Sequence, residues 1–320
     1  MTVHTRKAWW LGILRLASIL AGVGLITTRL GLVAHELIGH GGTAIACGGK
    51  VGEVRLFWFA GGWIHYDLAH PFSLTERLIV SLGGIALELV VGVAVWIACA
   101  RRTTLTGKIV RATGGAIVIH AAWYLAVGTY HGFGDGSIVR YAAGDGRYAI
   151  AIAGGLVVLG FAYAGARSIL GTFAATIAGS RRAQLAGVAI AVVLAGGLQA
   201  ALALGEVQLR RDETYGTVMK PERVRVVQQE LAQWEKDLRA RGAAIDAAAR
   251  RAREAELAAQ HRELPFAAIL GALTLFAILA GAWRSRPGTE TAITQRLVYL
   301  VAAFAVGSIA LVIAIDAVFA

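Results

Sequence analysis

Long apolar runs follow one another along most of the chain, with short polar segments between them. A helix needs about 20 predominantly apolar residues to cross about 30 Å of hydrocarbon, which is roughly the length of these runs. The pattern predicts about eight transmembrane helices, the first two separated by a polar break at 27–29. The predicted helices span residues 8–27, 30–46, 74–100, 109–127, 148–169, 183–204, 266–283 and 297–319.

Residues 47–72 show a different pattern. Apolar and polar positions alternate, Val, Phe and Trp are frequent, and pairs of glycines interrupt the segment. Alternation with a period of two is typical of a strand with one buried face, and glycine pairs favour turns. This segment is predicted to form a small β-hairpin at the membrane interface, with Gly61 and Gly62 at its turn.

Residues 205–264 are the one sizeable water-soluble segment in this prediction. Pro221 suits the first turn of a helix, and apolar residues then recur at intervals of three and four. These residues are Val224, Val227, Leu231, Trp234 and Leu238. The segment is either one long helix or a helical hairpin bent near Gly242. Its apolar stripe predicts a coiled-coil contact through 221–264, with a partner or with a second copy of the chain.

Composition agrees with the hydropathy pattern. Hydrophobic residues make up 57% of the sequence, charged residues only 16%, and the mean hydropathy is +0.63. Such values are typical of a polytopic membrane protein and not of a globular one. We expect an all-α, multi-pass protein of the lipid bilayer, in the cell membrane. The β-hairpin and the soluble helical insertion are additions to its transmembrane helices.

The net charge of +11 does not indicate a nucleic-acid partner, because the arginines lie mainly at the ends of the predicted helices. At helix ends they set the orientation, with basic loops on the cytoplasmic side. The loops at 101–111, 167–182 and 284–296 are therefore expected to be cytoplasmic, and residues 205–264 to lie outside. With eight helices the same rule places the basic N-terminal tail outside. One element is therefore misassigned or violates the rule.

Within the apolar run 30–49, His35, Glu36 and His40 are candidate functional residues. Ionisable groups at membrane depth are costly unless they pair, line a wet cavity or hold a metal. Zinc hydrolases usually present two histidines four residues apart on one helix face. Here the spacing is five, which separates the side chains by about 140° on a regular α-helix.

Three local structures would resolve this spacing. A π-bulge would bring positions i and i+5 together. Alternatively the helix could end at Gly39, because glycine favours left-handed C-terminal caps. In the third alternative Glu36 and His40, which are four apart, form the facing pair, and Glu36 is a ligand.

The run AHELIGHGGTAIACGGKV, followed by the hairpin and later by the tripeptide GDG, resembles the site-2 protease family of intramembrane zinc metalloproteases. The chain has HExxxH in place of HExxH, and it lacks the Asn and Pro that usually precede the Asp-Gly pair. The resemblance covers residues 30–141. It implies His35 and His40 as zinc ligands, Asp135 as the third ligand and Glu36 as the catalytic base.

On this resemblance the chain divides into five parts. They are the N-terminal tail and first span (1–29), the metalloprotease-like core (30–147) with its hairpin (47–72), the fifth and sixth spans (148–204), the soluble helical segment (205–264) and the last two spans (265–320).

The activity implied is zinc-dependent hydrolysis of peptide bonds in a membrane-protein substrate. Three side chains hold the ion and leave a position for water, whose proton Glu36 takes. Two alternatives stay open: a proton or cation transporter that uses Glu88, His120 and Asp135, and a catalytically inactive protease-like scaffold.

Two further residues are reserve candidates for the site. His131 lies near Asp135 in the sequence and is the reserve ligand if His40 is out of reach. Glu88 is interpreted as a paired or proton-handling group. It follows the run SLGGIAL, whose small residues predict close packing against another helix.

Overall fold

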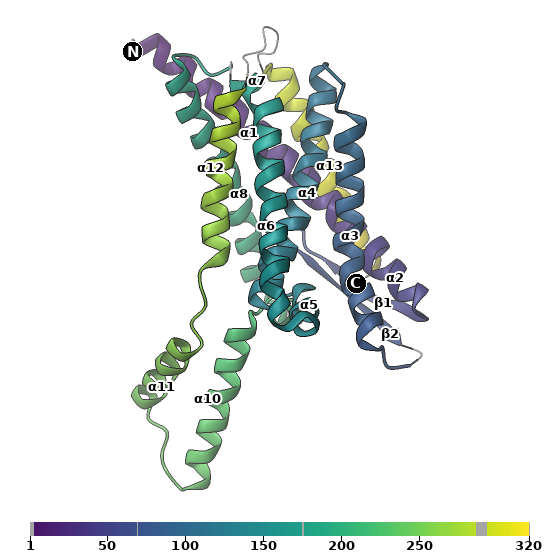
Figure 1. Cartoon of the computed structure of the whole chain (residues 1–320), viewed down its shortest axis with the longest axis vertical. Coiled ribbons are helices and arrows are strands. Elements are labelled where there is room, and N and C mark those ends of the chain that lie inside the picture. Colours follow the sequence, from purple (N-terminus) through teal and green to yellow (C-terminus); the bar gives the residue numbers. More distant parts are fainter. Residues whose placement is uncertain (1–2, 69, 175, 286–292, 320) are drawn as a thin grey trace.

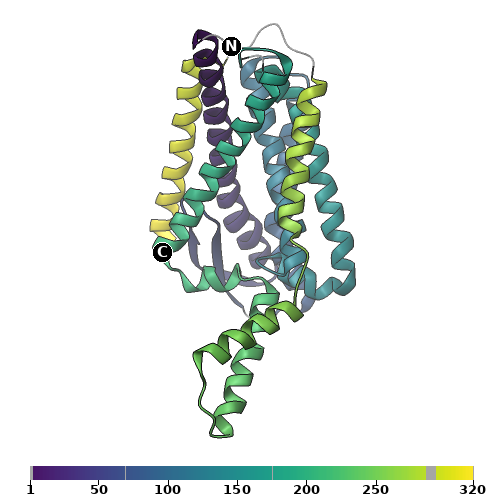
Figure 2. The ribbon, with the colours of Figure 1, turned by 90° about the vertical axis from the view of Figure 1, so that its left-hand side faces the viewer.

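The computed structural model describes residues 3–68, 70–174, 176–285 and 293–319. These residues form a bundle of long helices, with a two-stranded sheet and a helical hairpin at one end (Figure 1; Figure 2). Among them, seven helices are long and apolar enough to cross a membrane. The predicted all-α, multi-pass architecture with a small hairpin is therefore confirmed.

The membrane-spanning bundle contains α1 (Val3–Val33), the π-helix η1 (Ala34–Gly41), α2 (Gly42–Ala46), α3 (Leu74–Ala98), α4 (Leu105–His131), α5 (Gly136–Ala143), the 3-10 turn η2 (Gly144–Gly146), α6 (Arg147–Gly165), the π-helix η3 (Ala166–Leu170), α7 (Gly171–Ala174), α8 (Arg181–Arg210), α12 (Phe266–Arg284) and α13 (Gln295–Phe319). The remaining elements are β1 (Gly49–Leu56), β2 (Gly62–Leu68), α9 (Glu213–Val218), α10 (Glu222–Ala240) and α11 (Ala247–Gln260).

The prediction of two spans before residue 46 is wrong. One helix runs without interruption through α1, η1 and α2, so the predicted break at 27–29 does not exist. The sequence suggested a break because Arg29 is charged. In the structure Arg29 is buried, and its guanidinium donates hydrogen bonds to the carbonyls of Phe57 (2.6 Å) and Phe59 (3.1 Å). A buried charge is tolerated when such partners replace water.

Seven spans also remove the conflict over orientation. The N-terminus lies at the same end of the bundle as α7 and the α3–α4 connection (Figure 1). Described residues at and near the helix ends there include several Lys and Arg but no Asp or Glu: 6–12, 95–111, 164–174, 176–185, 278–285 and 293–297. The basic-inside rule therefore predicts a cytoplasmic location for this whole end. The β-hairpin and α10–α11 lie at the opposite end.

The β-hairpin forms where the sequence predicts it. Strands β1 and β2 pair antiparallel, with Leu56 opposite Gly62 and an irregularity between Val51 and Val54. Gly61 belongs to the turn and Gly62 begins β2. Val54 and Leu56 are fully buried in a cluster with residues of α1 and α13. One face of the sheet is thus packed against the bundle.

The turn of the β-hairpin is held by side chains from distant helices. The Glu206 carboxylate, from α8, accepts hydrogen bonds from the backbone N–H groups of three successive turn residues. These residues are Trp58, Phe59 and Ala60. The hydroxyl of Tyr215, in α9, accepts from the Gly61 N–H at 3.2 Å. Burial raises the pKa of Tyr215, so this hydroxyl stays protonated at neutral pH.

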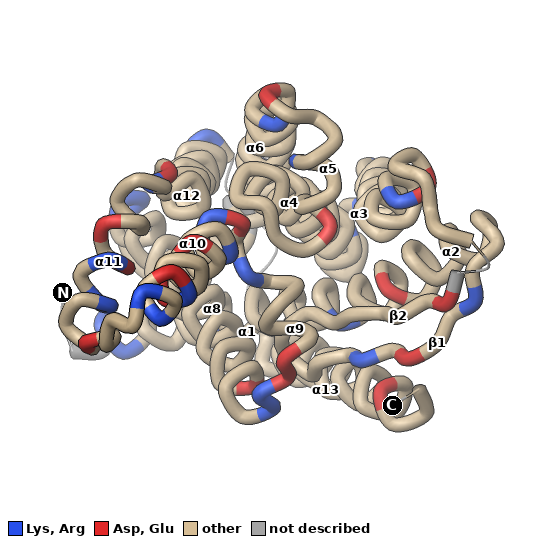
Figure 3. Tube along the Cα trace, turned by 90° about the horizontal axis from the view of Figure 1, so that it is seen from below, with Lys and Arg blue, Asp and Glu red and all other residues tan. Residues whose placement is uncertain are grey.

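The soluble segment is a helical hairpin and not one long helix. Helices α10 and α11 lie side by side below the bundle (Figure 1; Figure 2). Gly242, just after α10, has a φ of 71°, a conformation that glycine adopts without strain. Val227 and Leu231 of the predicted apolar stripe pack against Leu257 of α11. Figure 3 shows the charged residues of this hairpin from below.

Candidate metal centre

The HExxxH segment folds as a π-helix. Residues Ala34–Gly41 form η1 between the α-helical segments α1 and α2, which is the first of the three local structures that the spacing allows. A π-helix brings positions i and i+5 together. The rings of His35 and His40 accordingly lie 4.6 Å apart, measured between centroids, at an angle of 83°. Both histidines and Glu36 are buried.

Glycines of α3 make room for this segment. A Cβ on Gly84 would lie 2.6 Å from atoms of the His35 ring, and a Cβ on Gly39 would lie 2.4 Å from the Gly84 Cα. Real Cβ atoms essentially never come so close to their neighbours. The backbones of η1 and α3 are therefore in direct contact, which confirms the close packing predicted for SLGGIAL.

Asp135 meets both histidines. Its Oδ2 lies 3.0 Å from His35 Nε2 and 3.2 Å from His40 Nε2. In a tetrahedral zinc site, ligand distances of about 2.0–2.2 Å place neighbouring ligand atoms roughly 3.3 Å apart. Each of these two distances is therefore that of neighbouring ligand atoms around one ion. Asp135 occupies the N-cap position of α5 without a side-chain hydrogen bond to the helix, and its backbone N–H donates to the Tyr124 hydroxyl at 3.3 Å.

The Nδ1 atom of each histidine has a partner on the side of the ring away from Asp135. His40 Nδ1 donates to the carbonyl of Val80 at 2.6 Å, and His35 Nδ1 lies 3.3 Å from Oε2 of Glu88. If both Nδ1 atoms carry the protons, each neutral ring has its lone pair on Nε2, facing an Asp135 oxygen that is itself an acceptor; a proton on Nε2 instead makes these contacts hydrogen bonds to Asp135. Three acceptors that converge in this way fit a cation between them, and the donor set suits zinc.

Glu36 lies beside the two histidines. One candidate ligand atom each from His35, Glu36 and His40 lies within 4.8 Å of the others. Glu36 could therefore take part in the coordination or act on a molecule bound there.

Two cavities adjoin the candidate centre. One of about 520 Å³ is lined by His35, Glu36 and Glu88, by the turn of the β-hairpin and by part of α8. A smaller one, of about 120 Å³, is lined by Glu36, His40, Asp135 and residues of β2. Glu36 lines both cavities, so its carboxyl lies where a molecule in either could reach it.

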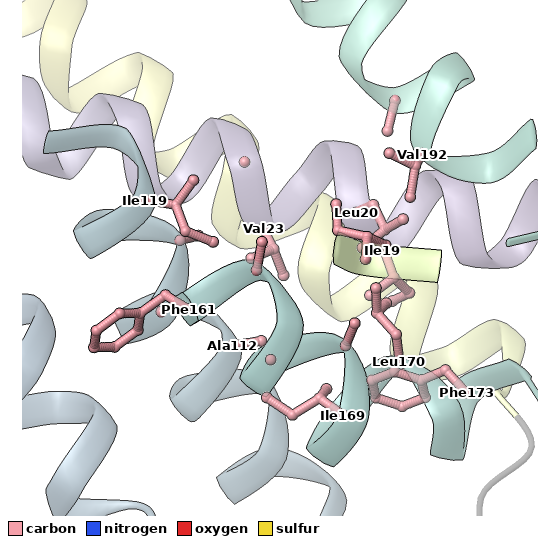
Figure 4. Close-up of a pocket in the computed structure, with 18 of the residues that line it drawn as sticks. Ile19, Leu20, Val23, Ala112, Ile119, Phe161, Ile169, Leu170, Phe173 and Val192 are labelled. Atoms are coloured by element: carbon pink, nitrogen blue, oxygen red, sulfur yellow. The ribbon is translucent and has the colours of Figure 1, made fainter. Parts of the chain in front are cut away.

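A third cavity differs from these in chemistry. It has a volume of about 290 Å³, and no ionisable side chain lines it. Figure 4 shows apolar side chains from α1, α4, α6 and α8 around it, including Val23, Ile119 and Phe161. This cavity offers shape but no acid, base or metal ligand, and we assign it no role in the candidate centre.

The remaining sequence candidates lie around the centre and not in it. Glu88 contacts His120 Nδ1 at 3.5 Å as well as His35. His131, the reserve ligand, is engaged elsewhere, because its Nδ1 lies 2.9 Å from Glu263 Oε2. Sequence reasoning missed Tyr124, although it follows His120 by four residues and so shares its helix face.

Comparisons with models of known protein families, with curated proteins and with solved structures find no match for this chain.

Proposed function

We propose that the protein is an intramembrane zinc metalloprotease that hydrolyses peptide bonds of membrane-protein substrates. One observation carries the proposal: the π-helix places the Nε2 atoms of His35 and His40 at 3.0 and 3.2 Å from the same oxygen of Asp135. Three protein ligands and an open fourth position are typical of catalytic zinc sites and not of structural ones.

Each residue has a role in this mechanism. His35, His40 and Asp135 would hold the ion, which would supply Lewis-acid chemistry to the scissile carbonyl and to water. Glu36 accepts the proton of the attacking water on its carboxylate and then delivers it to the nitrogen of the leaving amine. Glu88 keeps the ring of His35 oriented through Nδ1.

Water and substrate would share the larger cavity. Its volume of about 520 Å³ and its polar lining residues suit water at a site within a membrane protein. A substrate segment has to unwind locally there, because helical hydrogen bonding and packing shield the peptide bond. The β-hairpin turn at residues 59–61 lines the same cavity and would lie next to such a segment.

A second candidate function has an observation in its favour. His120, Glu88, His35 and Asp135 form an unbroken series of contacts of 3.5, 3.3 and 3.0 Å. Such a series could also carry protons in a transporter. A transporter that uses this series does not require Glu36, whereas the protease requires Glu36 as its base. A catalytically inactive scaffold requires neither the series of contacts nor Glu36.

Metal content tests the proposal first. Purified protein in detergent should contain about one zinc per chain, as a single three-ligand site requires. His35→Ala and His40→Ala should reduce this to background. The matched control is His65→Ala, since the side chain of His65 is 66% exposed on β2. Protein without zinc, or zinc unaffected by His35→Ala, would overturn the proposal.

Glu36→Gln then separates the functions. A protease should retain its zinc and lose cleavage of a single-span membrane substrate by about 10²–10⁴-fold, the usual contribution of a general base. Retained proton flux in proteoliposomes, with no cleavage by the unaltered protein, would favour the transporter. Absence of both activities in the metal-loaded protein would favour the scaffold.

A further inference from the structure

The loop that carries Asp135 is bound from outside the bundle. It connects α4 to α5, and two of its glycines, Gly132 and Gly134, have φ values of 68° and 52°. The Gly134 N–H donates to the carbonyl of Val218 at 2.9 Å, and Arg225 donates to the carbonyl of Gly132 at 2.9 Å. Val218 ends α9 and Arg225 lies in the first turns of α10, so both partners belong to the soluble segment.

Ion pairs join the same two regions. Glu263, which follows α11, contacts His131 Nδ1 at 2.9 Å and Arg140 Nη2 at 3.1 Å. Arg140, on α5, also pairs with Glu222 at the start of α10. The side chains of His131, Arg140 and Glu263 are at most 18% exposed, so the contacts among these three are shielded from water more than surface pairs are. Glu222 is 43% exposed. Residues at both ends of the α10–α11 hairpin thus contact residues on the N-terminal and the C-terminal side of Asp135.

This attachment matters because Asp135 is the one proposed ligand that does not belong to η1. Backbone in a glycine-containing loop has fewer restraints than backbone in a helix, and such segments open locally at low cost. On the bundle side, the Tyr124 hydroxyl meets the Asp135 N–H. The Gly128 carbonyl also accepts hydrogen bonds from the N–H groups of Gly132 and Phe133. The contacts with Val218, Arg225 and Glu263 add restraint from the extramembrane side.

We propose that Arg225, Glu222 and Glu263 are positioning residues for Asp135. Through them the extramembrane hairpin α10–α11 sets the distance between the Asp135 carboxylate and the two histidines. The inference rests on the proposed metal centre. It follows that anything that displaces the base of the hairpin, such as a molecule bound in the water outside the membrane, changes metal affinity without touching the metal ligands.

Cobalt(II) titration of the metal-free full-length protein tests this, because tetrahedral cobalt(II) has a visible absorption that reports ligand geometry. Arg225→Gln should weaken cobalt binding about tenfold and alter the absorption band, as loss of an outer-shell partner does. Arg225→Lys should restore most of the affinity, since an ammonium can still donate to the Gly132 carbonyl. The control is Arg223→Gln, at an exposed position on the same helix, which should match the unaltered protein.

Glu263→Gln provides a second arm, with the exposed Glu254 as its control. We expect Glu263→Gln to weaken cobalt binding about tenfold and Glu254→Gln to leave it unchanged. If the unaltered protein binds no cobalt, the proposed function fails. If it binds cobalt but Arg225→Gln and Glu263→Gln match it in affinity and spectrum, only this inference is overturned. The inference would also be overturned if the controls Arg223→Gln and Glu254→Gln lost as much cobalt affinity as Arg225→Gln and Glu263→Gln. Should Glu263→Gln fail to fold, the comparison of Gln and Lys at position 225 decides.

Discussion

The proposed metal ligands come from two regions that are built differently. His35 and His40 lie on one continuous helix, where the backbone of η1 and the contact with Gly84 fix their relative position. Asp135 lies in a loop with left-handed glycines, and residues of a distant soluble segment bind that loop. The first half of the site is therefore determined inside the membrane. The second half depends on structure outside it.

This difference indicates where the site can be adjusted. A change in η1 alters both histidines at once, because they share one helix and one packing surface. A change at the base of α10–α11 moves a single carboxylate. Substitutions in the two regions should consequently differ in the size of their effect on metal binding, which gives the following predictions.

The largest effect is expected from Gly84→Val. The added side chain would overlap the ring of His35, because even a Cβ at this position would lie 2.6 Å from it. We expect no zinc in the purified variant. Gly160→Val in α6 is the control, since a Cβ there meets open space and should leave the zinc content unchanged. Normal zinc content in Gly84→Val would show that the packing of η1 does not hold His35.

Asp135→Asn should have the next largest effect. It keeps the size of the side chain and removes the negative charge that faces both histidines. The loss of zinc affinity should exceed the 10–100-fold that is typical of outer-shell substitutions. Competition with a chelator of known affinity measures it, and Asp145→Asn, at an exposed position in η2, is the control. A loss of less than about tenfold would remove Asp135 from the ligand set.

Glu88→Gln should weaken zinc binding by about 10–100-fold, because Glu88 orients His35 without being a ligand. His120 contacts Oε1 of Glu88, and its side chain is 44% exposed. The effect of His120→Gln should therefore be smaller. The same chelator competition compares the two. An equal loss in both variants would mean that the whole His120–Glu88–His35 series acts as one unit, as the transporter alternative requires.

Deletion of Ile38 should have the smallest effect. A π-bulge is one extra residue in an α-helix, and Ile38 is 62% exposed within it. Removing it gives HExxH, in which the histidines are four apart and face each other on a regular helix. Zinc affinity should stay within about tenfold of the unaltered protein. Loss of all zinc would show that the packing of α2 and of the β-hairpin depends on the extra residue.

Much of the fold follows from the sequence, because the length of an apolar run and the spacing of its apolar positions can be read from neighbouring residues. The β-hairpin, the helical segment and a π-bulge as one of three alternatives at His35 were all predictable in this way. The choice of a π-helix was not, because it depends on glycines of α3 more than 40 residues away. Arg29 was misinterpreted for the same reason, since the carbonyls that bind it lie in the β-hairpin turn.

The site was less accessible to sequence reasoning than the fold. His35, Glu36 and His40 stand out because they are ionisable within an apolar run. Asp135 was suggested only by the resemblance of its Asp-Gly pair. Nothing local in the sequence indicates that Arg225 or Glu263 contacts its loop, because these contacts join residues 93 and 132 positions apart.

The uninterrupted first helix has a consequence for the lipid around it. The helix over Arg6–Ala46 has 41 residues and is roughly 60 Å long, twice the thickness of the hydrocarbon layer. It crosses the bundle obliquely (Figure 1), and tilt of this kind is how a helix that is too long accommodates a bilayer. His35 lies 29 residues beyond Arg6, or roughly 44 Å along the axis, which brings it toward the far headgroup region. The histidines are therefore nearer to the β-hairpin end of the bundle than to the N-terminal end, and water has the shorter path to them from that side.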